Sequence, residues 1–229
     1  MEYPHNRPYT ADDLVRIITL LRDPVNGCPW DKVQTHTSIR MNFLEEAYEA
    51  VDALDLDDPV LMCEELGDVL MQVAFHTCME QEAGRFTWEQ VCDGVCQKLI
   101  ERHPNIFGTQ PGYEGITDWD ALKNKEKGRR TLADDLESVP RAMPALMRAA
   151  KLQKRAARHG AALQGADAAA LADAAENLQT AQPASAQAER AVGELLFAAA
   201  NLARQAGVDP EQALQKANEA FCTAAGPVA

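Results

Sequence analysis

FLEEAYEAVDALDLDDPVLMCEELGDVLMQV, residues 43–73, contains two amphipathic segments joined by the short link DLDDP. Apolar residues recur three and four positions apart on both sides of the link, which is the spacing of one face of an α-helix. Within the link, Asp58 is a favourable helix N-cap and Pro59 suits the first position of the next helix. Because so short a connection makes consecutive helices antiparallel neighbours, this stretch predicts a helical hairpin.

The same signals extend outward from the hairpin. One helix is expected after the N-cap Thr10, a second over about 38–54, a third from Pro59 to near Gly84, and a fourth between Thr87 and His103. The apolar spacing of the second helix predicts inward-facing side chains at Ile39, Phe43, Tyr48, Val51 and Leu54. The intervening stretch RDPVNGCPWD (22–31) is rich in Pro and Gly and is expected to be a loop. Strand-like runs of Val, Ile and Thr are scarce. The sequence therefore predicts an all-α fold, with a four-helix bundle in the first half of the chain.

The second half of the chain resembles the first. The segment from Gly67 to Leu99 can be laid on the segment from Gly193 to Phe221, with Asp68 falling on Glu194. We therefore expect two tandem copies of one bundle. Residues 1–110 would form the first domain, 111–139 a linker, and 140–229 a second, degenerate domain.

Charge is distributed unevenly between the halves. The net charge is −13, yet residues 140–229 carry nine Lys and Arg against eight Asp and Glu, so the acidic excess lies in residues 1–139. Such a chain lacks the basic surface that binds nucleic acid phosphates. No apolar run approaches the length of a membrane span, and the N-terminus lacks the pattern of a signal peptide. We therefore expect a cytoplasmic protein that binds neither nucleic acid nor membrane.

Carboxylates are concentrated on the predicted hairpin. Glu46 and Glu49 share one helix face, as do Glu65 and Asp68, because residues three apart lie one turn from each other. If the helices are antiparallel, both acidic faces can meet near mid-helix. Converging carboxylates form an oxygen-rich site for Mg²⁺ or Mn²⁺. A solvated acidic face is the alternative, but flanking apolar residues place these acids beside the core and favour the metal site.

Several of these motifs, taken in order, resemble the MazG family of nucleoside triphosphate pyrophosphohydrolases. The resemblance rests on LLRDPVNGCPWDKVQTH, FLEEAYEAVDAL, EELGDVLMQVAFH, KLIERHPNIFG and SVPRAMPALMRAAKLQKRAA, and it covers most of the chain. It implies a helical bundle, usually a homodimer, that hydrolyses a nucleoside triphosphate to the monophosphate and diphosphate with Mg²⁺. House-cleaning or nucleotide-pool control would be its purpose.

The resemblance also implies roles for individual residues. Four carboxylates match the family's metal ligands: Glu46, Glu49, Glu65 and Asp68. Lys98 and Arg102 match its basic pair for the triphosphate, although without the resemblance a solvated basic face is the simpler interpretation. Residues expected near the nucleotide are Trp30, Asp31, Trp119 and Lys123, but both tryptophans could equally be ordinary core or loop residues. Glu45 is the candidate for orienting or deprotonating the attacking water.

The second copy lacks these charged positions. Glu65 aligns with Ala191, Lys98 with Ala220, and Arg102 with Ala224. The active site is therefore expected in the first half, with the second half as a scaffold. The alternative hypothesis is a catalytically weak or inactive helical protein that binds nucleotides or regulates a partner.

Overall fold

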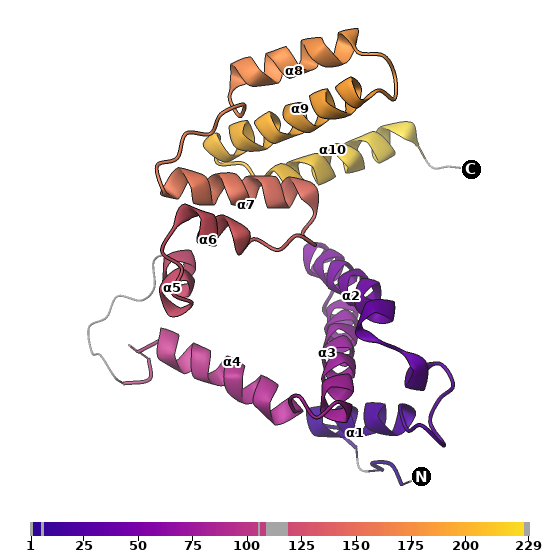
Figure 1. Cartoon of the computed structure of the whole chain (residues 1–229). Helices are drawn as coiled ribbons and strands as arrows, with labels where there is room; N and C mark the ends of the chain where they lie inside the picture. Colours follow the sequence, from indigo (N-terminus) through magenta and orange to yellow (C-terminus); the bar gives the residue numbers. More distant parts are fainter. Residues whose placement is uncertain (1, 6, 105, 109–118, 227–229) are drawn as a thin grey trace. The chain divides into compact units, whose positions relative to one another are not determined.

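The computed structural model describes residues 2–5, 7–104, 106–108 and 119–226, apart from the side chains of residues 119–121 and 123. Throughout that part of the chain the regular structure is helical, with ten α-helices and one short 3-10 turn (Figure 1). The all-α prediction is confirmed. None of the helices in these ranges combines the length and apolar character needed to cross a lipid bilayer.

The chain divides into two compact units, Met1–Ile116 and Thr117–Ala229. The first unit contains α1 (Ala11–Leu21), the 3-10 turn η1 (Asp31–Val33), α2 (His36–Leu56), α3 (Pro59–Glu82) and α4 (Trp88–Arg102). Helix starts follow the predicted caps, because the Thr10, Asp58 and Thr87 side chains each accept a backbone hydrogen bond from the following turn. Helix α2 begins two residues earlier than predicted, capped by Thr35.

Two consecutive aspartates, Asp57 and Asp58, form the turn between α2 and α3. Asp57 ends α2 in the left-handed conformation, with φ 53°. Asp58 Oδ1 then accepts hydrogen bonds from the backbone N–H groups of Val60 at 2.9 Å and Leu61 at 3.2 Å, which starts α3. These local contacts reverse the chain and lay the two helices side by side (Figure 1).

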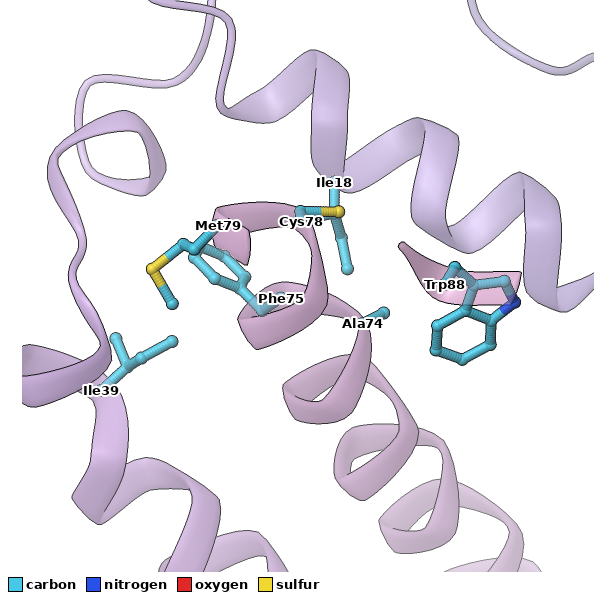
Figure 2. Close-up of a cluster of buried hydrophobic side chains, with 7 residues drawn as sticks. All are labelled: Ile18, Ile39, Ala74, Phe75, Cys78, Met79 and Trp88. Carbon is cyan, nitrogen blue, oxygen red and sulfur yellow. The ribbon is translucent and has the colours of Figure 1, made fainter. Parts of the chain in front are cut away.

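The core of the first unit lies at the C-terminal half of α3. Figure 2 shows its buried side chains packed together, contributed by all four helices: Ile18, Ile39, Ala74, Phe75, Cys78, Met79 and Trp88. Trp88 brings the first turn of α4 into this core and is 8% exposed. The N-terminal half of α3, which carries Glu65 and Asp68, therefore stays outside the core.

Helix α2 contacts α3 through small residues. Ala50 and Ala53 are buried, whereas Tyr48, Val51 and Leu54 are about half exposed, at 52%, 49% and 52%. The sequence pattern had predicted these three large side chains to point inward, and within this chain that is wrong. Alanines let the two helix backbones approach closely, so the larger residues face away from the hairpin. Large apolar side chains are exposed on α3 as well, at Leu66 and Leu70.

Helix α4 packs on α3 only near its start. Beyond Trp88 its apolar residues Val95, Leu99 and Ile100 are each 49% exposed, and Figure 1 shows α4 diverging from α3. Large apolar residues of α2 and α3 are exposed as well, so the first unit leaves apolar side chains of all three helices uncovered. We call these exposed side chains together the uncovered face; its residues are Tyr48, Val51, Leu54, Leu66, Leu70, Val95, Leu99 and Ile100.

The second unit is also helical. It contains α5 (Trp119–Glu126), α6 (Leu132–Glu137), α7 (Ala145–Arg158), α8 (Ala168–Thr180), α9 (Ala186–Gln205) and α10 (Pro210–Ala225). Helices α8 and α9 form an extensively packed pair, and α7 and α10 pack against α9. The segment predicted as a linker, 111–139, contains α5 and α6. The domain boundaries, and the idea that the units are copies of one domain, stay predictions.

A buried ion pair joins α6 to α7. Asp135, 1% exposed, lies 3.0 Å from Arg155 Nη1 through its Oδ1 and 3.1 Å from His159 Nε2 through its Oδ2. Burial alone would raise the pKa of Asp135, but hydrogen bonds from Asn124 and His159 and the Arg155 charge hold it below its usual value. Gln153 links α7 to α9, because its side chain donates a hydrogen bond to the Phe197 carbonyl at 2.7 Å.

Candidate active site

The hairpin brings three carboxylates together. Ligand oxygens of Glu46 and Glu49 on α2 and Glu65 on α3 all lie within 4.8 Å of one another. Glu46 and Glu49 share a face because they are three residues apart, and the antiparallel turn at Asp57 sets Glu65 opposite them. We call these three side chains the acidic cluster.

The acidic cluster is electrostatically unfavourable without a cation. Burial raises the pKa of Glu46, and the charges of Asp68 and Glu49 add to the rise. Burial likewise raises the pKa of Glu65, followed by the charges of Glu64, Asp68 and Glu46. Glu46 and Glu65 thus resist ionisation beside the neighbouring acids, and a bound cation would offset the repulsion.

The donor set fits a hard divalent cation. Three carboxylates from two rigid helices supply oxygen ligands of the kind that Mg²⁺ and Mn²⁺ prefer, with room for water and substrate oxygens at exposed Glu49. No soft ligand, thiolate or imidazole, belongs to this cluster. The residues present therefore suit a metal of this class.

Asp68 lies near the cluster, whereas Glu45 points away from it. Asp68 is outside the group defined by the 4.8 Å spacing, but its charge raises the pKa of both Glu46 and Glu65, which places it nearby. It follows Glu65 by one turn of α3. Glu45 is exposed and directly precedes Glu46 on α2, so its side chain is turned about 100° around the helix from that of Glu46.

Sequence reasoning missed Gln72. This residue is 7% exposed, and its Nε2 donates a hydrogen bond of 3.4 Å to Glu46 Oε1. Its Oε1 is buried without a protein partner among the described residues. Gln72 follows Asp68 by one helical turn, and that spacing in GDVLMQ was the available signal. Its geometry suits it to hold Glu46 in place.

Trp30 and Asp31 precede α2 and lie near the part of α3 that carries Phe75. Trp30 is 57% exposed and packs edge-on against Phe75, with ring centroids 6.5 Å apart. Arg22 Nη1 fixes the loop by donating to the Asp31 carbonyl at 2.8 Å. Phe75 is seven residues beyond Asp68, about 10 Å along a helix. The structure therefore does not bring this pair against the acidic cluster.

The basic candidates are on other helices. Lys98 is exposed on the part of α4 that diverges from α3, and Arg102 is half-buried in the last turn of that helix. The structure does not place Lys98 beside the acidic cluster. Trp119 and Lys123 are in α5, and their side chains lie outside the described residues.

A histidine pair links the first turn of α2 to the C-terminal half of α3. His36 Nδ1 is 2.7 Å from His76 Nδ1, and His36 Nε2 is 2.6 Å from Glu80 Oε1. Burial, and then the charge of His36, lower the pKa of His76. Hydrogen bonds from Arg85 are the main reason that the pKa of Glu80 falls to about 2. This network joins the start of α2 to α3.

Fold and site together define an all-α protein with a carboxylate cluster on a helical hairpin. Residues 34–107 match the model of the MazG nucleotide pyrophosphohydrolase domain, a range that contains the acidic cluster, Asp68 and Lys98. The chain is 41% identical over 219 residues to the nucleoside triphosphate pyrophosphohydrolase of Escherichia coli K12, covering 92% of this chain and 83% of that protein. It is 39% identical over 212 residues to the nucleoside triphosphate pyrophosphohydrolase/pyrophosphatase MazG of Thermotoga maritima, covering 92% and 82%.

An uncharacterized protein of Bacillus subtilis, YabN, is 37% identical over 213 residues, which is 90% of this chain but 43% of YabN. Similarity at this level over nearly the whole chain establishes the relationship. The chain belongs to the MazG family of nucleoside triphosphate pyrophosphohydrolases.

Proposed function

We propose that this protein is a Mg²⁺-dependent nucleoside triphosphate pyrophosphohydrolase that converts NTP and water to NMP and diphosphate. The acidic cluster is the observation that carries the proposal, because its three converging carboxylates fit a divalent cation and the pKa values of two of them, Glu46 and Glu65, are raised. The names of the two full-length relatives give the same activity. House-cleaning or control of the nucleotide pool is the cellular role that we infer.

Glu46, Glu49, Glu65 and Asp68 would hold the metal, with Mn²⁺ as an alternative ion. When bound, the metal supplies positive charge to the triphosphate and to the developing charge at the reacting phosphorus. Gln72 would keep the Glu46 carboxylate oriented through its hydrogen bond. Exposed Glu45, which precedes Glu46 on α2, would accept the proton of the attacking water, whose oxygen bonds to the α-phosphorus as diphosphate leaves.

The remaining residues would bind the nucleotide. Lys98 and Arg102 lie one turn apart on α4 and would bind triphosphate oxygens. Trp30 and Asp31, with Trp119 and Lys123, would approach the nucleoside, because a tryptophan can stack on a base. These assignments rest on the family pattern.

A homodimer would complete this site. The uncovered face leaves large apolar side chains of α2, α3 and α4 half exposed, and an exposed apolar surface of this kind is typical of an interface. A second copy would cover this surface and bring its own α4, with its basic pair, to the hairpin. The acidic net charge argues against nucleic acid as a partner. We expect the protein to act in the cytoplasm without a membrane partner.

The reaction can be tested directly. Purified protein is incubated with each NTP and dNTP in Mg²⁺, and diphosphate, monophosphate and inorganic phosphate are measured separately. Equal amounts of diphosphate and NMP are expected. Inorganic phosphate with NDP would overturn the assigned bond cleavage, and no product under any condition would favour a nucleotide-binding or regulatory protein.

A further inference from the structure

The second unit contains a cavity that shares no residue with the acidic cluster. It has a volume of about 520 Å³ and lies between α7 and the turn that joins α9 to α10. Its lining consists of Met143, Met147, Ala150, Lys151, Lys154, Arg204, Gly207, Val208, Asp209 and Pro210. Cavities of this size bind small molecules in many proteins.

Three cations surround this cavity without anionic partners. Lys151 and Lys154 are three residues apart on α7, so they share a face, and Arg204 joins them from the end of α9. Within the described ranges, none of the three forms an ion pair with a carboxylate. The one acid in the lining, Asp209, already accepts hydrogen bonds from two backbone N–H groups that begin α10, those of Glu211 and Gln212. A cluster of like charges is best stabilised by an anion.

The arginine is oriented by a buried side chain. Arg204 Nε donates to Asn201 Oδ1 at 2.9 Å, and Asn201, 2% exposed, donates in turn to the Ala166 carbonyl at 2.6 Å. This chain of hydrogen bonds fixes the plane of the guanidinium. In the described part of the chain, no other hydrogen bond to Arg204 is seen, which leaves its terminal amino groups for a ligand. A fixed guanidinium suits the two oxygens of a phosphate.

The rest of the lining is apolar. Met143 and Met147 lie along α7, and Val208 and Pro210 lie on the α9–α10 turn. Methionine side chains adapt to flat and irregular ligands, including aromatic rings. One cavity therefore offers cations for a phosphate and an apolar wall for a ring system.

We propose that this cavity is a second nucleotide site, in which Lys151, Lys154 and Arg204 bind the phosphates of a nucleoside phosphate. The base would pack against Met143, Met147 and Val208. Because the carboxylates that would hold a metal belong to the first unit, the second site would bind a nucleotide without hydrolysing it. The inference rests on the proposed function only in its choice of nucleotides as ligands.

The test is isothermal titration of the full chain with ATP in excess EDTA, where the metal-dependent site cannot hold the triphosphate through a cation. One ATP per chain is expected to bind. Lys151→Gln and Arg204→Gln should each weaken binding by about 10-fold or more, the usual effect of losing a charged hydrogen bond. Adenosine and diphosphate, which each present half of the ligand, should bind more weakly than ATP.

Two controls locate the binding. Lys216→Gln on exposed α10 and Arg16→Gln on α1 of the first unit each remove one positive charge from an exposed position outside the cavity; both should bind ATP like wild type. The proposal is overturned if ATP gives no binding in EDTA, or if Arg204→Gln and Lys151→Gln match Lys216→Gln. It is also overturned if Lys98→Gln, at the proposed triphosphate site of the first unit, alone abolishes binding. Because no turnover is needed, failure here would leave the pyrophosphohydrolase proposal intact.

Discussion

The hairpins α2–α3 and α8–α9 share their packing and differ in their charges. Both pack through small residues: Ala50, Ala53 and Ala74 are buried in the first, and Ala174, Ala191 and Ala198 in the second. Where the first has its acidic cluster, the second has a cavity of about 600 Å³ whose carboxylates are Asp173 and Glu194. Ala191 stands where the alignment puts Glu65.

The comparison shows that the residues that pack a hairpin are not the residues that would bind a metal. Buried alanines determine how closely the helices approach, whereas partial burial and mutual repulsion raise the pKa values of Glu46 and Glu65, so that these carboxylates add cost rather than packing. A hairpin can therefore lose its carboxylates and keep its fold. We therefore propose metal-dependent chemistry in the first unit, and packing and ligand binding in the second.

The largest expected difference is between Asp68→Asn and Glu194→Gln, which alter aligned positions in the two hairpins. Asp68→Asn should lower diphosphate release by about 100-fold or more, because a proposed metal ligand is lost. Glu194→Gln changes an exposed side chain and should leave the rate within about twofold of wild type. Initial rates of diphosphate release at saturating Mg²⁺ compare the two variants with wild type. Large loss in a folded Glu194→Gln protein would place the chemistry in the other unit.

The second prediction concerns assembly. Leu54→Asp places a charge in the uncovered face of the first unit and should weaken self-association by about 30-fold or more, as expected for an apolar interface residue. Val25→Asp, at a 78% exposed loop residue outside that face, is the matched control. Sedimentation velocity over a concentration series measures both. A monomeric wild type would refute the dimer.

A third comparison uses two buried glutamines. Gln72→Leu should weaken metal binding by about 10-fold, because Glu46 loses the hydrogen bond that orients it. Gln153→Leu removes the hydrogen bond from α7 to α9 and should lower the melting temperature without changing metal affinity. Titration with Mn²⁺ and thermal melting separate the effects. Equal metal affinity in wild type and Gln72→Leu would show that Gln72 does not position the site.

The smallest expected effect is on pH dependence. The pKa values of Glu46 and Glu65 are raised on folding, so the folded metal-free protein binds more protons than the unfolded chain between pH 4.5 and those raised values. These two groups therefore add stability as pH falls through that window. His76, whose pKa is lowered, acts in the opposite direction below about pH 6.5.

Comparison with Glu46→Gln/Glu65→Gln isolates the first contribution from that of His76. In EDTA, the wild type should gain stability relative to this double variant as the pH is lowered from 7 toward 4.5, measured by urea unfolding. Parallel stability curves for the two proteins would mean that the carboxylates are not strained by burial and by each other.

Local signals in the sequence predicted the helices well. Thr10, Asp58 and Thr87 cap helices as expected, because capping depends on residues within one turn. The approach of Glu46 and Glu49 to Glu65 also followed from helical spacing and a short turn.

Tertiary contacts account for what was not predicted. Periodicity marked Tyr48, Val51 and Leu54 as inward but could not show that alanines would take the contact with α3. The divergence of α4, and with it the position of Lys98, depends on packing beyond one helix. Gln72 and the cavity beside Arg204 required the actual arrangement of side chains.

Calorimetric titration with Mg²⁺ in the absence of nucleotide tests directly whether the acidic cluster binds a metal ion. Exposed Glu49 can be changed to glutamine with little risk to the fold, and Glu194→Gln is its counterpart in the second unit. Millimolar or tighter binding is expected in wild type and Glu194→Gln, and its loss in Glu49→Gln. Identical titrations for wild type and Glu49→Gln would show that the acidic cluster is a solvated surface rather than a metal site.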